Sequence, residues 1–196
     1  MEEIQRGVSK EDLSMLPLFL RGKVIKGFGR GSKDLGCPTA NLPTESYEAT
    51  IKDIPIGVFF GWANVKGIDS ESVIHKMVMS VGWNPFYKNE KKTLEIHILN
   101  RYDRDFYGEQ VNAIATGFIR PMCDFKSLEG LIKAINDDIS YASEQLDTAE
   151  QQLFKSHQFF SHCCNESSTP PSQEAIDSTE NENNSNHRDV LSFKLN

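Results

Sequence analysis

Short apolar runs alternate with turn-forming residues along roughly the first 120 residues of the chain. The runs are rich in Val, Ile, Phe and Trp, and Gly, Pro, Asn and Asp separate them, which is typical of β-strands joined by turns. The pattern predicts strands over residues 18–26, 56–65, 74–82, 93–99 and 110–118. No segment between them is long enough for a crossover helix, so we expect an antiparallel sheet. Closure into a Greek-key-like β-barrel would leave no exposed sheet edge.

A helical pattern follows the strands. Between Leu128 and Leu153, apolar residues recur at spacings of three and four, while polar residues, Asp137 and Asp138 among them, fall largely on the other side. This period predicts one long amphipathic helix packed against the barrel. We therefore expect a mostly β fold with a long C-terminal α-helix.

The two ends of the chain differ in composition from its body. From Asn165 onward the sequence is rich in Ser, Asn and Glu and nearly free of aliphatic side chains. Such a segment buries too little apolar surface to offset the entropy cost of ordering it. We expect an N-terminal extension at residues 1–15, a folded domain at residues 16–160 and a disordered acidic tail at residues 161–196.

The charge of the chain narrows the choice of partners. The formal net charge is −7, and most of it lies at the two ends, so the body is nearly neutral. A nearly neutral body has no broad positive field to attract nucleic acid, so local groups must hold any bound phosphate. No run approaches the roughly 20 apolar residues that span a bilayer, and the chain starts without a secretion signal. We expect a cytoplasmic protein with no membrane or nucleic-acid partner.

A glycine-rich stretch, residues 27–33, directly follows the first predicted strand. Glycines let backbone N–H groups approach phosphate oxygens closely, and Arg30 and Lys33 add positive charge. The spacing matches neither a P-loop nor a dinucleotide fingerprint. The alternative is a flexible turn between strands, and the residues alone leave both interpretations open.

The segment Cys37-Pro38-Thr39-Ala40-Asn41 offers two neutral oxygen ligands. In an extended segment, Thr39 and Asn41 lie on the same side because they are two residues apart. Magnesium favours oxygen ligands, and at a nucleotide it uses few protein groups beside the phosphates. The alternative is a turn in which both side chains bind their own backbone.

A carboxylate lies within the fourth predicted strand. Leu94, Ile96 and Ile98 share one face, so Glu95 shares the other face with His97. A single carboxylate on a strand is usually an outward, solvated residue. If its face lines a cleft, Glu95 could accept the proton of a hydroxyl that attacks phosphorus.

These motifs occur in an order that is specific. GFGRGSKDLGCPTAN, then SVGWNPFYKNEKKTLEIHIL, then DFYGEQV and GFIRP together closely resemble the eukaryotic, monofunctional riboflavin kinases over about residues 16–153. The resemblance implies a compact antiparallel β-barrel and a helix, with ATP and riboflavin meeting over an open end. It also implies transfer of the γ-phosphate of ATP to the riboflavin 5′-hydroxyl, with FMN and ADP as products.

The resemblance also implies roles for individual residues. Thr39 and Asn41 would bind Mg²⁺, or another divalent cation such as Zn²⁺, and Glu95 would be the catalytic base. The residues implied for ATP binding are Gly27, Lys33, Ile98, Asn100 and Tyr107. Those implied for flavin binding are Arg120, Cys123 and Phe125. The chain departs from some relatives at Asn100, where a histidine can stand, and at Cys123, where a lysine can stand.

Three other functions are alternatives to riboflavin kinase activity. A barrel that holds riboflavin or FMN without turning it over is the first alternative, although the presence of Glu95, Thr39 and Asn41 favours an enzyme. An oligonucleotide-binding barrel would need a basic groove, which the nearly neutral body does not indicate. A kinase acting on another small alcohol is the third. We expect a monomer whose partners are riboflavin and ATP.

Overall fold

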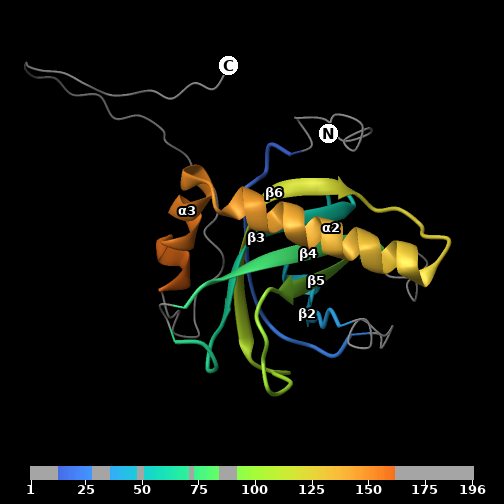
Figure 1. Cartoon of the computed structure of the whole chain (residues 1–196). Coiled ribbons are helices and arrows are strands. Elements are labelled where there is room, and N and C mark those ends of the chain that lie inside the picture. The colour runs from blue at the N-terminus through green and yellow to red at the C-terminus, as the bar shows by residue number, and fades with distance from the viewer. Residues whose placement is uncertain (1–12, 28–35, 48–50, 71–72, 84–91, 162–196) are drawn as a thin grey trace, which may run out of the picture. The chain divides into compact units, whose positions relative to one another are not determined.

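The computed structural model of the chain describes residues 13–27, 36–47, 51–70, 73–83 and 92–161. In this part of the chain, six antiparallel strands form one sheet that curls into a barrel (Figure 1). The strands are β1 (Leu18–Lys23), β2 (Ala40–Leu42), β3 (Gly57–Val65), β4 (His75–Trp83), β5 (Lys92–Ile98) and β6 (Gln110–Pro121). Their spatial order is β1-β6-β3-β4-β5-β2. Strand β6 returns to lie beside β3 after the β3-β4-β5 meander, which is a Greek-key arrangement.

The two edges of the sheet meet just after β1. The Val24 amide donates to the Glu109 carbonyl at 2.9 Å, next to β6, and the Ile25 amide donates to the Asn41 carbonyl of β2 at 2.9 Å. Ile25 and Asn41 thus form a bridge between the first and last strands of the sheet. We call this contact the seam. It brings the barrel nearly to closure, and the predicted β-barrel is confirmed.

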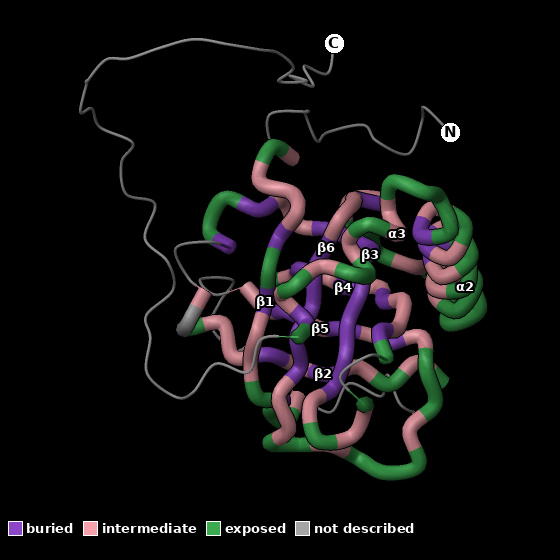
Figure 2. Tube along the Cα trace, turned by 90° about the vertical axis from the view of Figure 1, so that its left-hand side faces the viewer, coloured by how far each residue is buried: buried purple, intermediate pink, exposed green. Residues whose placement is uncertain are grey.

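The barrel has a core inside and a second core outside. Strand β3 is buried along its whole length (Figure 2), because its two faces pack in different cores. Phe59, Ala63 and Val65 point into the inner core. Val58, Phe60 and Trp62 point outward, beneath the C-terminal helices. Burial on both faces explains why β3 is an unbroken apolar run rather than an alternating one.

Two α-helices and two short 3₁₀ turns complete the described structure. They are η1 (Glu45–Tyr47), α2 (Leu128–Leu146), α3 (Ala149–Lys155) and η3 (Gln158–Phe160). Helix α2 lies across the outer face of the barrel over β3 and β4 (Figure 1). Its first turn is capped by Ser127, whose hydroxyl accepts from the Gly130 amide at 3.1 Å. None of the described helices is apolar and long enough to cross a bilayer.

The predicted C-terminal helix is present but shorter than expected. It ends at Leu146 instead of continuing to Leu153, because Thr148 adopts an extended conformation (φ −69°, ψ 149°). The Thr148 hydroxyl donates to the Gln145 carbonyl at 2.8 Å, a local bond that competes with helix continuation. The Gln152 side chain then donates to the Leu146 carbonyl at 2.7 Å, and α3 starts in a new direction.

Strand β2 was not predicted, because three residues are too few to show an alternating pattern. The other five strands occur where they were predicted, with ends shifted by up to a few residues. Most of the predicted extension at residues 1–15 lies outside the described residues. So does the predicted tail, apart from Ser161.

Candidate functional site

Three oxygen-bearing side chains meet where β2 pairs with β5. On β5, Leu94, Ile96 and Ile98 are buried in the inner core, so Glu95 lies on the outer face. Asn41 is the direct cross-strand partner of Glu95. The Thr39 hydroxyl donates to Glu95 Oε2 at 3.3 Å. The structure therefore brings together the predicted base and both predicted metal ligands.

His97 holds the segment that carries Thr39. It lies on the same face of β5 as Glu95, and its Nδ1 lies 2.8 Å from the Pro38 carbonyl oxygen. A carbonyl can only accept, so Nδ1 carries the proton in this contact. The sequence analysis gave His97 no role, although the alternation of β5 had already placed it beside Glu95. Its contribution is to fasten the Pro38–Thr39 backbone to β5.

Gly27 lies close against the Asn41 side chain. A Cβ atom at position 27 would lie 2.5 Å from Asn41 Nδ2, far inside van der Waals contact, so only glycine fits without a shift. The first residue of the glycine-rich stretch therefore lies directly against a predicted metal ligand. Lys33, the other predicted residue of this stretch, lies outside the described residues.

The connection between β5 and β6 carries the remaining residues predicted for ATP. Ile98 is 5% exposed and packs in the inner core, so a ligand would meet its backbone rather than its side chain. Asn100 is exposed, and its amide donates to the Ile98 carbonyl at 2.8 Å. Tyr107 is 54% exposed. Ile98 ends β5, and Asn100 and Tyr107 lie on the loop that follows it, where both are accessible.

A buried carboxylate anchors this loop. Asp69, in the β3–β4 connection, accepts from the Val65 amide at 2.8 Å and from the Tyr102 hydroxyl at 2.9 Å. Its other oxygen lies 3.1 Å from His75 Nε2. Burial and the hydrogen bond to Asp69 raise the pKa of Tyr102, so its phenol stays protonated and donates. We call Asp69, His75 and Tyr102 the loop anchor. Sequence reasoning missed it.

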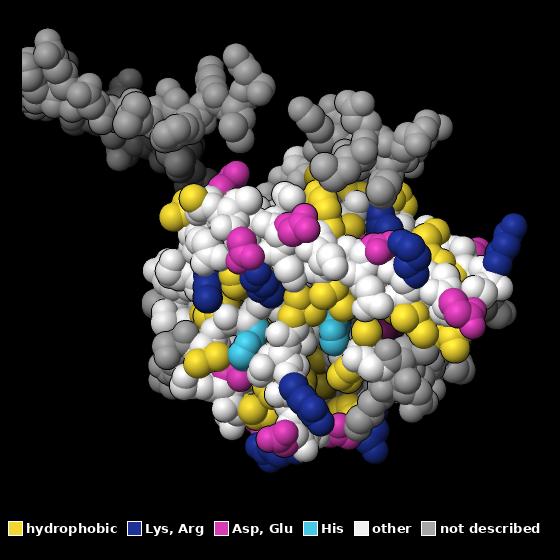
Figure 3. Space-filling view, in the orientation of Figure 1, with side chains coloured by type: hydrophobic (Ala, Val, Ile, Leu, Met, Phe, Trp, Pro, Cys, Tyr) yellow, Lys and Arg dark blue, Asp and Glu magenta, His cyan; other side chains and the backbone are white. Residues whose placement is uncertain are grey.

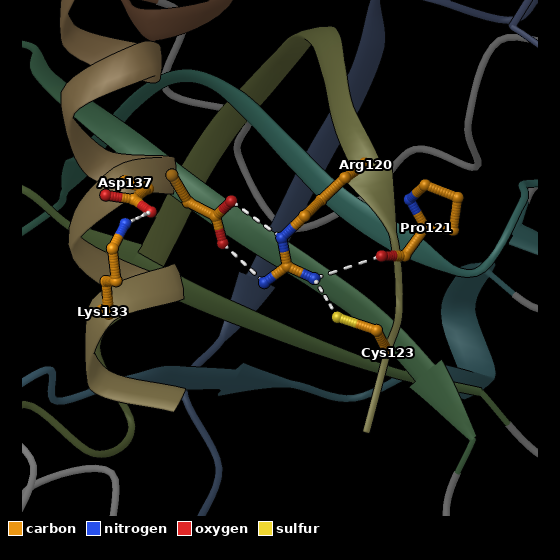
Figure 4. A network of polar contacts seen from close by, with 6 residues as sticks. Arg120, Pro121, Cys123, Lys133 and Asp137 are labelled. Carbon is orange, nitrogen blue, oxygen red and sulfur yellow. Dashed lines mark hydrogen bonds and ion pairs between the residues drawn. The ribbon is translucent and has the colours of Figure 1, made fainter. Parts of the chain in front are cut away.

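Arg120, predicted to contact flavin, is the next-to-last residue of β6 and makes several polar contacts. Its Nε and Nη2 donate to the two carboxylate oxygens of Asp138, at 2.9 and 2.8 Å. Its Nη1 donates to the Pro121 carbonyl at 3.1 Å and to the Cys123 Sγ at 3.2 Å (Figure 4). The Phe125 ring lies 5.6 Å from the guanidinium carbon. All three residues predicted for flavin binding are thus in contact, with Arg120 at the centre.

Asp138 is buried, which the sequence analysis did not expect. The residue is 6% exposed, whereas the helical pattern had assigned it largely to the polar side of α2. Burial raises the pKa of the Asp138 carboxyl above its ordinary value, and the Arg120 guanidinium offsets this only in part. Its neighbour Asp137 points to solvent and pairs with Lys133 at 2.6 Å (Figure 4).

A single cross-strand row joins the two groups of residues. Strand pairing aligns neighbouring residues of β6, β3, β4, β5 and β2. In order across the sheet, the row consists of Arg120, Val58, Ser80, Glu95 and Asn41. Because neighbouring strands lie about 4.8 Å apart, Arg120 and Glu95 are separated by roughly 14 Å along the sheet. The predicted flavin residues and the predicted base therefore belong to one outer face of the barrel.

Charge on the face that carries α2 is mixed. Lys and Arg side chains are interspersed with Asp and Glu side chains there (Figure 3). Anion binding on this face therefore depends on individual groups rather than on a broad positive field.

Known proteins resemble the chain in sequence. The model of the riboflavin kinase family, Flavokinase, matches residues 14–146. Riboflavin kinase of Mus musculus is 49% identical over 145 residues, which cover 74% of this chain and 91% of the mouse protein. Riboflavin kinase of Homo sapiens is 48% identical with the same coverage.

The fold has a solved counterpart as well. The crystal structure of riboflavin kinase from Trypanosoma brucei superposes with a TM-score of 0.61 and 29% sequence identity. The match covers 76% of this chain and 88% of the trypanosomal one. Sequence motifs, family model and fold agree, and the chain belongs to the riboflavin kinase family.

Proposed function

We propose that this protein transfers the γ-phosphate of ATP to the 5′-hydroxyl of riboflavin and releases FMN and ADP. The observation that carries the proposal is the meeting of the Glu95 carboxylate with Thr39 and Asn41 on one outer edge of a riboflavin kinase barrel. Phosphoryl transfer relies on positioning and on stabilising charge, so a site of this kind needs few reactive side chains.

The oxygens of Thr39 and Asn41 fit a divalent cation. Both are neutral, hard ligands, and the absence of a Cβ at Gly27 leaves the Asn41 amide its space. Magnesium prefers such oxygens and keeps waters or phosphate oxygens in its other positions. We propose that Thr39 and Asn41 hold Mg²⁺, or another divalent cation such as Zn²⁺. When bound, the cation would neutralise charge on the ATP phosphates.

Glu95 serves as the general base. It takes the proton of the riboflavin 5′-hydroxyl as that oxygen bonds to the γ-phosphorus, and the bond from the γ-phosphorus to ADP breaks. The hydrogen bond from Thr39 orients the carboxylate for this task. The β2–β5 pairing fixes its distance from Asn41 and hence from the phosphates.

The two substrates would approach Glu95 from different elements. ATP would lie against Gly27, Lys33, the backbone of Ile98, Asn100 and Tyr107. Riboflavin would lie toward Arg120, Cys123 and Phe125, at the other end of the cross-strand row. We further propose that the protein acts as a monomer in the cytoplasm.

Glu95→Gln tests the proposed base directly. The variant should keep the fold and bind riboflavin, but it should form FMN about 10²- to 10⁴-fold more slowly, which is the usual cost of losing a general base. Chromatography of FMN from riboflavin, ATP and MgCl₂, with an EDTA control, measures this rate. Glu144→Gln, a substitution at an exposed position of α2, is the matched control. Full activity of Glu95→Gln would remove Glu95 from this role.

The same assay separates the enzyme from the alternative of a non-catalytic flavin-binding barrel. Wild-type protein that binds riboflavin but forms no FMN with ATP and any divalent cation would favour the non-catalytic protein. Product that requires a divalent cation would support the proposed reaction.

A further inference from the structure

The guanidinium of Arg120 is committed to protein groups. Of its five N–H donors, four take part in the bonds to Asp138, Pro121 and Cys123. The Arg120 side chain is 15% exposed and that of Asp138 is 8% exposed, so both charges are largely withdrawn from water. Arg120 therefore has little capacity left to bind a ligand through its own N–H groups.

The contacts of Arg120 join three elements. Asp138 belongs to α2, Arg120 and Pro121 are the last two residues of β6, and Cys123 and Phe125 lie in the connection between them. The fork of two parallel hydrogen bonds to Asp138 fixes the plane of the guanidinium. That plane in turn decides where Nη1 points, and Nη1 binds both the Pro121 carbonyl and the Cys123 thiol (Figure 4).

We propose that Asp138 is a positioning residue for riboflavin: through Arg120, it holds the segment 121–125 in the conformation that receives the flavin. The inference rests on the flavin contacts proposed above for this segment. Helix α2 would thus contribute to riboflavin binding through Arg120, without touching riboflavin itself.

A neutral side chain at position 138 leaves the Arg120 charge without its carboxylate partner. The variant should therefore be less stable than the wild type, and thermal unfolding shows whether it remains folded at the assay temperature. An asparagine has the same shape but offers only one acceptor oxygen, and its amide N–H₂ would face guanidinium N–H groups. Asp138→Asn therefore removes the fork and frees Arg120 to rotate while leaving the packing of α2 in place.

The adjacent residue provides a matched control. Asp137 and Lys133 form an exposed pair, with side chains 63% and 76% exposed, on the same turn of α2. Water screens such a pair, so its loss has little effect on structure. Asp137→Asn makes the same chemical change one residue away and leaves Arg120 untouched.

The experiment compares both variants with the wild type in the full chain. We measure the Kd of riboflavin from flavin fluorescence, the KM of riboflavin and of ATP, kcat, and thermal unfolding. Asp138→Asn should raise the Kd and KM of riboflavin by roughly 10-fold or more, as expected for losing paired charge-assisted hydrogen bonds. The KM of ATP should stay within about twofold, and Asp137→Asn should match the wild type in every measurement.

Arg120→Lys tests the same link from the other side. Lysine keeps the charge but cannot form the fork, so it should reproduce the selective loss of riboflavin affinity. The double variant should be no worse than either single variant, because both changes break one link. This variant also decides the question if Asp138→Asn fails to fold.

Two results would overturn the inference: unchanged riboflavin affinity in folded Asp138→Asn, or equal increases in the KM of both substrates. The Kd measurement needs no turnover, so the inference is tested even if the wild type forms no FMN. Conversely, FMN formation by both Asp138→Asn and the wild type with equal riboflavin KM would refute the role of Asp138 and leave the proposed reaction intact.

Discussion

The hydroxyl of Thr39 has two proposed partners, the Glu95 carboxylate and the divalent cation. It donates to Glu95 at 3.3 Å, and it lies two residues from Asn41 on an extended segment that pairs with β5. A hydroxyl can donate one hydrogen bond and still accept or coordinate through its oxygen. Thr39 can therefore orient the base and bind a cation at the same time, whereas an apolar side chain at this position would do neither.

Thr39→Ala tests the two proposed roles of the hydroxyl, because it removes the hydroxyl and leaves the backbone of the segment unchanged. The variant should need about 10-fold more Mg²⁺ for half-maximal rate, because one of two protein ligands is lost, and riboflavin affinity should change little. Titration of MgCl₂ at fixed ATP in the FMN assay measures this. Thr39→Ser keeps the hydroxyl and is the control. The same Mg²⁺ requirement in Thr39→Ala and the wild type would rule out Thr39 as a ligand.

At the scale of elements, the barrel strands are rigidly paired while the loops are fixed by a few side chains. The loop anchor connects the β3–β4 connection to the β5–β6 loop. The rings of His75 and Phe106 pack edge-on against Tyr102, with centroids 6.1 and 4.9 Å away. The β5–β6 loop carries Asn100 and Tyr107, so the anchor sets the position of the proposed ATP contacts.

Tyr102→Phe should therefore affect ATP more than riboflavin. The ring contacts stay, but the buried Asp69 loses one donor, at a cost of about 1–3 kcal/mol in the free energy of unfolding. The KM of ATP should rise severalfold with the KM of riboflavin nearly unchanged. Steady-state kinetics and urea unfolding provide both numbers. Tyr141→Phe, on α2, is the control, and equal changes in both KM values would contradict the anchor's role.

Elements also show what a pattern in the sequence can and cannot predict. Alternation predicted the face of Glu95 and His97 on β5, because strand geometry fixes it locally. The spacing of apolar residues wrongly predicted that the helix continues past Thr148. There, a hydrogen bond from the Thr148 hydroxyl to the Gln145 carbonyl ends α2 although the apolar spacing continues. The spacing also misplaced Asp138, because the burial of a carboxylate depends on a partner from β6 that lies 18 residues earlier in the chain.

The residues of the candidate site likewise divide into those that local sequence patterns can indicate and those that depend on partners distant in the sequence. The roles proposed for Thr39, Asn41 and Glu95 come from the family resemblance, which rests on motifs with a fixed local spacing. The loop anchor was not predicted, because Asp69 and Tyr102 come from separate connections and meet only once the barrel has formed. Arg120 was assigned to flavin, and the structure adds that its charge is already paired with Asp138.

At the scale of the whole molecule, the buried pair between α2 and β6 links stability to pH. The ordinary pKa of an aspartate is 3.8, and burial raises the pKa of Asp138 above this value in the folded protein. A raised folded-state pKa means that the folded protein binds the proton more tightly than the unfolded chain. The stability linked to this group is therefore present at low pH and lost as the pH rises through the folded-state pKa.

The wild type should accordingly gain stability relative to Asp138→Asn as the pH falls from 7 toward about 4, where the unfolded carboxyl titrates. Urea unfolding of both proteins at several pH values measures the difference. Other carboxylates titrate alike in the two proteins, so their effect cancels. A difference that shrinks on acidification would show that the Arg120 charge, rather than burial, dominates.

The seam of the barrel has a consequence for how the protein responds to its substrate. Asn41 accepts the backbone bond that joins the two edges of the sheet, and its side chain is a proposed ligand of the cation that accompanies ATP. Whatever binds the Asn41 side chain also restrains the backbone that closes the barrel. A bound nucleotide would then stabilise the seam against local opening. The seam would open most readily after ADP has left and before the next ATP binds.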